Sequence, residues 1–144
     1  MIEQDTIKLL RECDAGVKMG IASIDDVLPY AKGQDFKDLL TKCKEAHERL
    51  REEIESLLSQ YHDGGKEPNP MAKGMSWIKV KLELFVNESD AKIADLMTDG
   101  CNMGVKSLNR YLNEYEAAEE KVKDIAKKLI ALEERLTLDM RDYL

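Results

Sequence analysis

The sequence is poor in the residues that build metal centres, tight turns and membrane spans. Its 144 residues include two histidines, three cysteines and three prolines. No Cys-x-x-Cys pair occurs, which excludes zinc ribbons and thioredoxin-like redox sites. No segment approaches the run of about eighteen apolar residues that a membrane-spanning helix needs. The first ten residues lack the basic start and apolar stretch of a secretion signal, so we expect a cytoplasmic protein with free thiols.

The chain also lacks a concentrated basic surface. Its formal net charge is -7, and each Lys or Arg cluster is interleaved with Glu or Asp. Nucleic acid and anionic membrane are therefore excluded as expected partners, since both need clustered positive charge. Charged residues make up 35% and hydrophobic residues 43% of the chain, with only eight glycines. This mixture is typical of a helical protein, and residues 1–144 are long enough for one domain.

Four long segments repeat apolar residues at spacings of three and four, the pattern of one buried helical face. They cover residues 3–31, 36–61, 90–112 and 116–143. Gly33 lies between the first two and indicates the end of the first helix. Two long helices joined by a few residues must run antiparallel, so the first two segments form a hairpin.

The middle of the chain leaves alternatives open. Residues 71–86 fit a short helix, but they also alternate like a strand. We favour the helix, because a lone strand has no partner. A helix ending at Gly100 or Gly104 leaves a last helix of about 40 residues, roughly 60 Å long. A break at residues 87–90, where Ser and Asp are good caps, gives four helices of similar length, and we choose that division.

These segments predict an all-α four-helix bundle with up-down-down-up order. Residues 62–89 form the long crossover between the second and third helices in this prediction. Three stretches carry a family resemblance: CKEAHERLREEIESLL (43–58), MSWIKVKLELF (75–85) and LMTDGCNMGVKSLNRYLNEY (96–115). In these three stretches the chain resembles the small bacterial ferritin-like domains of unknown function, which are related in fold to rubrerythrin and bacterioferritin.

The resemblance implies the ferritin-like fold but not iron chemistry. A ferritin-like di-iron site takes a Glu from each of two helices and a Glu-x-x-His from each of the other two. Lys44 lies three residues before His47, and Ser59 lies three before His62. The last two predicted helices contain no histidine. We therefore expect no di-iron centre, no ferroxidase or oxygenase activity and no catalytic residue.

One group of residues suggests a binding site. Cys43 and His47 are four apart, so they project from one helical face, where a leucine would be expected at position 47. Cys101 on the third helix and Asp14 on the inward face of the first could join them. Asp14 is about 7 Å from His47 in axial height by helical rise. These residues either hold a single transition metal or a small ligand, or are buried core residues that satisfy one another.

Two glycine pairs suggest a second feature of the bundle. Gly16 and Gly20 lie one turn apart in the first helix, as do Gly100 and Gly104 in the third. Glycine inside a helix costs up to about 1 kcal/mol relative to alanine, so the pairs indicate a structural reason. Close packing of the two helices is the favoured interpretation, and a slot for a ligand is the alternative.

The predicted crossover has more large apolar residues than one short segment can bury in its own bundle. They are Met75, Trp77, Ile78, Leu84 and Val86. We therefore predict a homodimer with Trp77 as an anchor, the alternative being a crossover that buries both of its faces itself. Two functions follow from the sequence: a non-catalytic module acting through protein contacts, or a binder of a metal or small ligand at His47.

Overall fold

The computed structural model describes residues 2–67 and 89–144. These ranges contain helices and turns and no strand. The four long helices are α1 (Ile2–Val27), α2 (Gln34–Gln60), α4 (Asp90–Glu114) and α5 (Glu120–Met140). Two 3-10 turns accompany them, η1 (Leu28–Tyr30) after α1 and η3 (Arg141–Tyr143) after α5. The predicted all-α four-helix bundle is confirmed.

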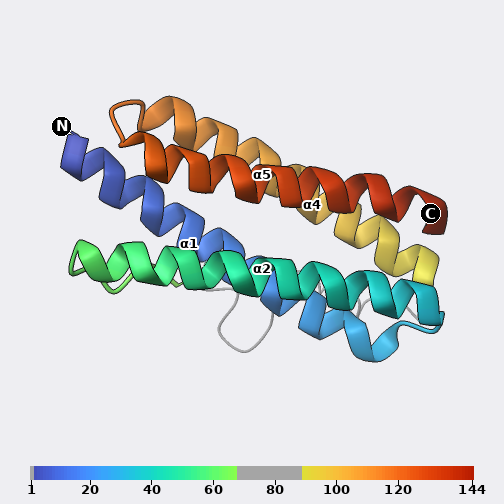
Figure 1. Cartoon of the computed structure of the whole chain (residues 1–144). Helices are drawn as coiled ribbons and strands as arrows, with labels where there is room; N and C mark the ends of the chain where they lie inside the picture. The colour runs from blue at the N-terminus through green and yellow to red at the C-terminus, as the bar shows by residue number, and fades with distance from the viewer. Residues whose placement is uncertain (1, 68–88) are drawn as a thin grey trace.

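The helices pack as two antiparallel hairpins. Figure 1 shows α1 and α2 in one layer and α4 and α5 in the other, with the two termini at opposite ends of the bundle. The Asp90 carboxylate accepts hydrogen bonds from Lys32 N and Gly33 N at 2.8 and 2.9 Å, so α4 begins beside the α1–α2 turn. Helix α4 therefore runs parallel to α2. The predicted up-down-down-up order is confirmed by these contacts.

The helix ends differ from the predicted ones for identifiable reasons. Helix α1 ends at Val27, because Pro29 lies in the first turn of η1 and has no N–H to continue the α-helical ladder. Helix α5 begins at Glu120 rather than 116. Glu119 has an extended backbone and is the N-cap of α5, and the N–H groups of Ala117 and Glu119 bond to side chains of α1. Ser89 caps α4 as predicted, accepting a bond from Lys92 N.

The buried apolar residues form two clusters, one toward each end of the bundle. The cluster near the α1 N-terminus contains Leu9, Leu10, Val17, Leu50, Ile54, Leu58, Val122 and Leu129 among others. The other contains Ile24, Val27, Phe36, Leu40, Ile93, Met97, Leu136 and Met140 among others. Along α2 the residue between the clusters is His47, and along α5 it is Glu133. A polar layer therefore divides the core near its middle.

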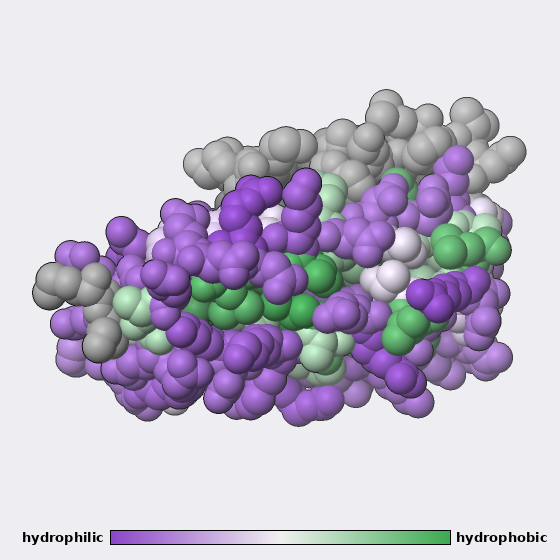
Figure 2. All heavy atoms as spheres, turned by 90° about the horizontal axis from the view of Figure 1, so that it is seen from above, coloured by the Kyte–Doolittle hydropathy of each residue, from purple (hydrophilic) through white to green (hydrophobic). Residues whose placement is uncertain are grey.

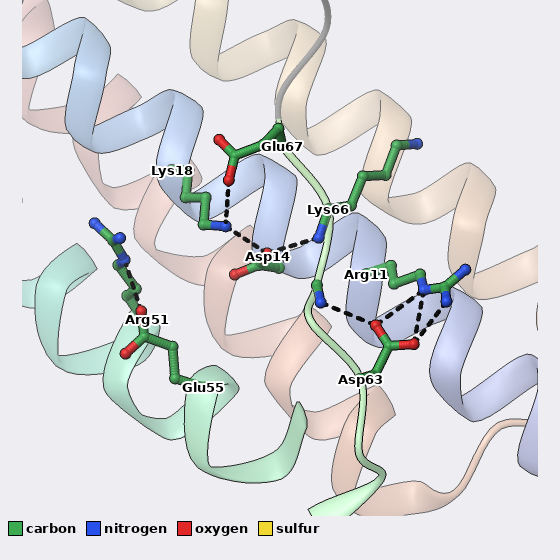
Figure 3. A network of polar contacts seen from close by, with 9 residues as sticks. Arg11, Asp14, Lys18, Arg51, Glu55, Asp63, Lys66 and Glu67 are labelled. Atoms are coloured by element: carbon green, nitrogen blue, oxygen red, sulfur yellow. Dashed lines mark hydrogen bonds and ion pairs between the residues drawn. The ribbon is translucent and has the colours of Figure 1, made fainter. Parts of the chain in front are cut away.

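The segment that follows α2 is attached to α1 by ion pairs between oppositely charged side chains (Figure 3). We call residues 62–67 the strap. Asp63 binds Arg11 through both carboxylate oxygens, and the hydrogen bond from Arg11 lowers the pKa of Asp63. Further along, Glu67 pairs with Lys18. Residues 71–86, whose short helix was predicted, and Trp77 with its proposed dimer contact lie outside the described residues.

Candidate functional site

His47 is the centre of the polar layer. Its side chain is only 1% exposed, and its ring is held from both edges. Nδ1 lies 2.8 Å from the carbonyl oxygen of Cys43, one turn earlier in α2, and 3.5 Å from the Cys43 thiol sulfur. Nε2 lies 3.3 Å from a carboxylate oxygen of Glu133 in α5. The sequence placed Cys43 and His47 on one face correctly, and the structure adds Glu133.

The hydrogen-bond partners of His47 determine the net charge of the pair formed by His47 and Glu133. A carbonyl oxygen can only accept, so Nδ1 carries a proton. If Glu133 is ionised, Nε2 must donate to it and the ring is an imidazolium. Burial lowers the pKa of His47, but the hydrogen bonds that the ring makes to Cys43 and Glu133 outweigh it and raise this pKa to about 10. If the proton instead sits on Glu133, both groups are neutral. Either way the pair has no net charge.

Gly20 of α1 makes room for the imidazole. A Cβ added at this position would stand 2.7 Å from Cδ2 and 2.8 Å from Nε2 of His47. Real Cβ atoms do not come that close, so any larger residue at position 20 would force the ring to shift. On the other side, a Cβ at Gly104 of α4 would stand 3.8 Å from the second carboxylate oxygen of Glu133, an ordinary contact. Both glycine pairs predicted from the sequence thus face or border this layer.

A cavity of about 650 Å³ opens along the polar layer between α1, α4 and α5. The four glycines of the two pairs line it, together with His47, Glu133 and Cys101. Most of the remaining described wall is apolar, including Met19, Ile24, Met97, Leu108, Leu129 and Leu136. The cavity agrees with the alternative of a slot, and close packing of α1 on α4 at these glycines stays a prediction.

The thiols near the layer are held in their protonated form. Burial, followed by the negative charge of Glu133, raises the pKa of Cys101. Burial, followed by the charges of Glu12 and Asp14, raises the pKa of Cys13 to about 12. A nucleophilic cysteine needs a lowered pKa and access to solvent, and these two buried thiols have neither.

Asp14 does not join His47. Its side chain is 1% exposed and pairs with Lys18 at 2.8 Å (Figure 3). It also accepts a hydrogen bond from the backbone N–H of Lys66 at 2.9 Å, which fastens the strap to α1. One carboxylate oxygen, Oδ1, has no hydrogen-bond partner within the described residues. The axial height predicted from helical rise was insufficient, because the side chain faces the strap and not α2.

The candidate metal ligands thus divide into two groups. His47, Cys43 and Cys101 gather around Glu133, and Asp14 lies apart with the strap. In the described parts of the chain, no group of three or more His, Cys, Asp or Glu side chains is arranged to hold a metal ion. The single-metal hypothesis gains no support from this geometry and stays a prediction.

Glu133 is the functional candidate that sequence reasoning missed. In residues 116–143 the spacing of three and four can be met by Leu129, Leu132 and Leu136, and Leu132 is partly buried against the core. Glu133 lies four residues after Leu129 and three before Leu136, so it fits an inward position equally well. That spacing was the available signal. A carboxylate at such a position needs a buried partner, and His47 provides it.

Comparison with known proteins identifies the fold. No family model matches the chain, and no curated protein matches it. Among solved structures, the chain is similar to the crystal structure of a DUF305 fragment from Deinococcus radiodurans, with a TM-score of 0.74. The alignment covers 96% of this chain and 93% of that one at 12% sequence identity. At this identity the likeness shows the bundle fold alone. The bundle expected from the ferritin-like resemblance is present, while membership of that family is not shown.

The described helices also bear on the membrane question. None of them is both long enough and apolar enough to cross a bilayer.

Proposed function

We propose that this protein binds a small, largely apolar molecule in the cavity between α1, α4 and α5. The observation that carries the proposal is the cavity itself, about 650 Å³ with His47 and Glu133 in its wall. Ligand pockets in proteins typically measure about 300 to 1,000 Å³ and combine an apolar lining with a few placed polar groups. This cavity has both properties.

The glycines support this proposal. Gly16, Gly20, Gly100 and Gly104 all border the cavity. In mid-helix each costs up to about 1 kcal/mol relative to alanine, so four of them need a compensating reason. A side chain at Gly104 would meet only ordinary contacts with Glu133, so packing does not require glycine there. Open space for a ligand is a reason that covers this position as well.

Binding is favoured over catalysis and over metal storage by the chemistry of the wall. The thiol of Cys101 has a raised pKa, and the imidazole of His47 is already paired with Glu133. No nucleophile with a neighbouring base therefore presents itself in the described wall. Of the two functions expected from the sequence, the geometry favours small-ligand binding at His47.

Filling the cavity tests the proposal. N-phenyl-1-naphthylamine, an uncharged aromatic amine whose fluorescence rises in apolar surroundings, would be titrated into the protein. We expect saturable, one-to-one binding to the wild type. Gly104→Leu places a side chain in the cavity and should weaken binding at least about tenfold, a loss of about 1.4 kcal/mol. Ser107→Leu, at another lining position, provides an independent second obstruction.

The matched control is Asn102→Leu, which adds the same side chain at an exposed position of α4 outside the cavity wall. It should bind the probe like the wild type. Circular dichroism melting would establish that each variant is folded. The proposal is overturned if the wild type shows no saturable binding. It is equally overturned if both obstructed variants bind as tightly as the control.

A further inference from the structure

The charged groups in the cavity wall occur as two matched pairs. His47 and Glu133 form one pair, at 3.3 Å between Nε2 and Oε1. Lys66 of the strap and Glu12 of α1 form the other, at 2.5 Å between Nζ and Oε1. No other charged residue lines the cavity within the described part of the chain. The described wall therefore has no unmatched charge to offer an ion.

This balance does not depend on where the protons lie. The His47–Glu133 pair is neutral whether the proton sits on the ring or on the carboxylate. In the described wall a charged ligand would meet no free opposite charge, and uncompensated burial of a charge is strongly unfavourable. An anion gains nothing from the protein as a whole either, because the net charge is -7. The described part of the wall therefore favours an uncharged ligand.

The cavity is also elongated. Its α1 wall extends from Glu12 to Ile24, and twelve helical steps span about 18 Å. Apolar side chains lie on both sides of the polar layer, Leu108 and Leu129 toward one end and Met97 and Leu136 toward the other. Glu133 contributes an acceptor near the middle, since a carboxyl group has an oxygen that accepts a hydrogen bond in either protonation state.

From these observations we propose that the cavity takes an uncharged, elongated, apolar molecule carrying a hydroxyl group that donates a hydrogen bond to Glu133. A long-chain alcohol is the simplest member of this class. The inference rests on the proposed function and specifies its ligand. It predicts that charge on a ligand, of either sign, weakens binding at equal chain length.

Competition with three ten-carbon chains tests the charge requirement. Decan-1-ol, decanoate and decylammonium would each displace N-phenyl-1-naphthylamine from the wild-type protein at pH 7. We expect decan-1-ol to compete at a concentration at least about tenfold lower than either ion, because neither ion meets an unpaired opposite charge in the described wall. The methyl ether of decan-1-ol, which has no donor, tests the hydrogen bond and should compete more weakly than the alcohol.

Two variants test whether the charge balance causes the selectivity. Glu12→Gln leaves Lys66 without its partner and should improve competition by decanoate relative to the alcohol. Lys66→Gln leaves Glu12 unpaired and should do the same for decylammonium. The backbone N–H of Lys66 still binds Asp14 in that variant, so the strap keeps this attachment.

The outcomes separate this inference from the proposed function. If the probe binds in a Gly104-sensitive manner but decanoate or decylammonium competes as well as decan-1-ol, the cavity binds ligands and the inference of an uncharged ligand is wrong. An ether that competes as well as the alcohol overturns the hydrogen bond to Glu133. If the probe does not bind the wild type at all, the proposed function fails and the inference fails with it.

Discussion

At the scale of single residues, the bundle keeps a buried ion pair where apolar packing would be simpler. Such a pair seldom adds stability relative to well-packed apolar residues, because both groups lose their hydration. His47 and Glu133 nevertheless sit between two apolar clusters and border the cavity. In the proposed function these two groups are the polar part of the ligand site. Their removal one at a time would leave the other group unpaired.

The pH dependence of stability should report the His47–Glu133 pair. The folded-state pKa of His47 is raised to about 10, and an unfolded histidine titrates near 6.5. Between these values the folded chain holds a proton that the unfolded chain has lost, so the free energy of unfolding falls as pH rises. The slope should approach about 1.4 kcal/mol per pH unit. Below pH 6.5 this contribution is fully present.

Urea unfolding of the wild type and of His47→Gln at several pH values from 6.5 to 8.5 measures this slope. The variant is the control because it lacks the titrating group, and this range lies mostly below the titration of unfolded cysteines. The difference in free energy of unfolding between the two proteins should shrink as pH rises. A constant difference across the range would contradict a raised pKa of His47.

At the scale of elements, the strap is the contact that fixes the end of α2 against α1. Its attachments come from three residues of one short segment, with Asp63 on Arg11, the backbone of Lys66 on Asp14 and Glu67 on Lys18 (Figure 3). Ion pairs at exposed positions contribute little individually. The bond from Lys66 to the buried Asp14 differs, because a buried carboxylate left without donors is costly. The strap also places Lys66 in the cavity wall.

Gly65 should be the residue on which the strap depends most. Its φ of +82° is unfavourable for residues with a side chain, and an added Cβ would collide with the Asp14 carboxylate. We expect Gly65→Ala to lower the free energy of unfolding by about 1 to 3 kcal/mol. Gly64→Ala is the matched control, because nothing lies within 4 Å of a Cβ there. Thermal or urea unfolding measures both, and equal stabilities would refute the importance of this turn.

At the scale of the whole molecule, the exposed apolar residues bear on how the protein associates. Figure 2 shows a face that is mostly hydrophilic, with a hydrophobic strip along its middle. Among the described residues, the large apolar side chains most exposed are Tyr30, Met103, Leu138 and Leu144. These are scattered along the sequence, and single exposed apolar residues are ordinary on soluble proteins.

Self-association through residues 71–86 stays a prediction, with Trp77 as the proposed anchor. Sedimentation velocity across a concentration series should show a dimer of the wild type. Trp77→Ala should weaken the dimer at least about tenfold, since aromatic anchors dominate the binding free energy of interfaces. Tyr30→Ala, which removes an exposed aromatic from η1, is the control and should dimerise normally. A wild type that stays monomeric throughout, or a dimer unaffected by Trp77→Ala, contradicts the proposal.

The sequence by itself determined the helices and their order. Apolar spacing of three and four, Gly33 at the first turn and Ser89 before α4 are local signals, and local signals suffice to place helices. Helix length then determined the topology, because four helices of similar length leave residues 62–89 to return along the bundle. The face shared by Cys43 and His47 followed from the same periodicity.

Only the tertiary structure decided what those faces meet. Glu133 as the partner of His47, Asp14 as a partner of the strap, and the cavity bordered by the glycine pairs all join residues far apart in the chain. Periodicity tells which side of a helix is buried, but not the rotation and separation of its neighbours. Those depend on how all side chains pack together, so a glycine pair alone cannot distinguish close contact from open space.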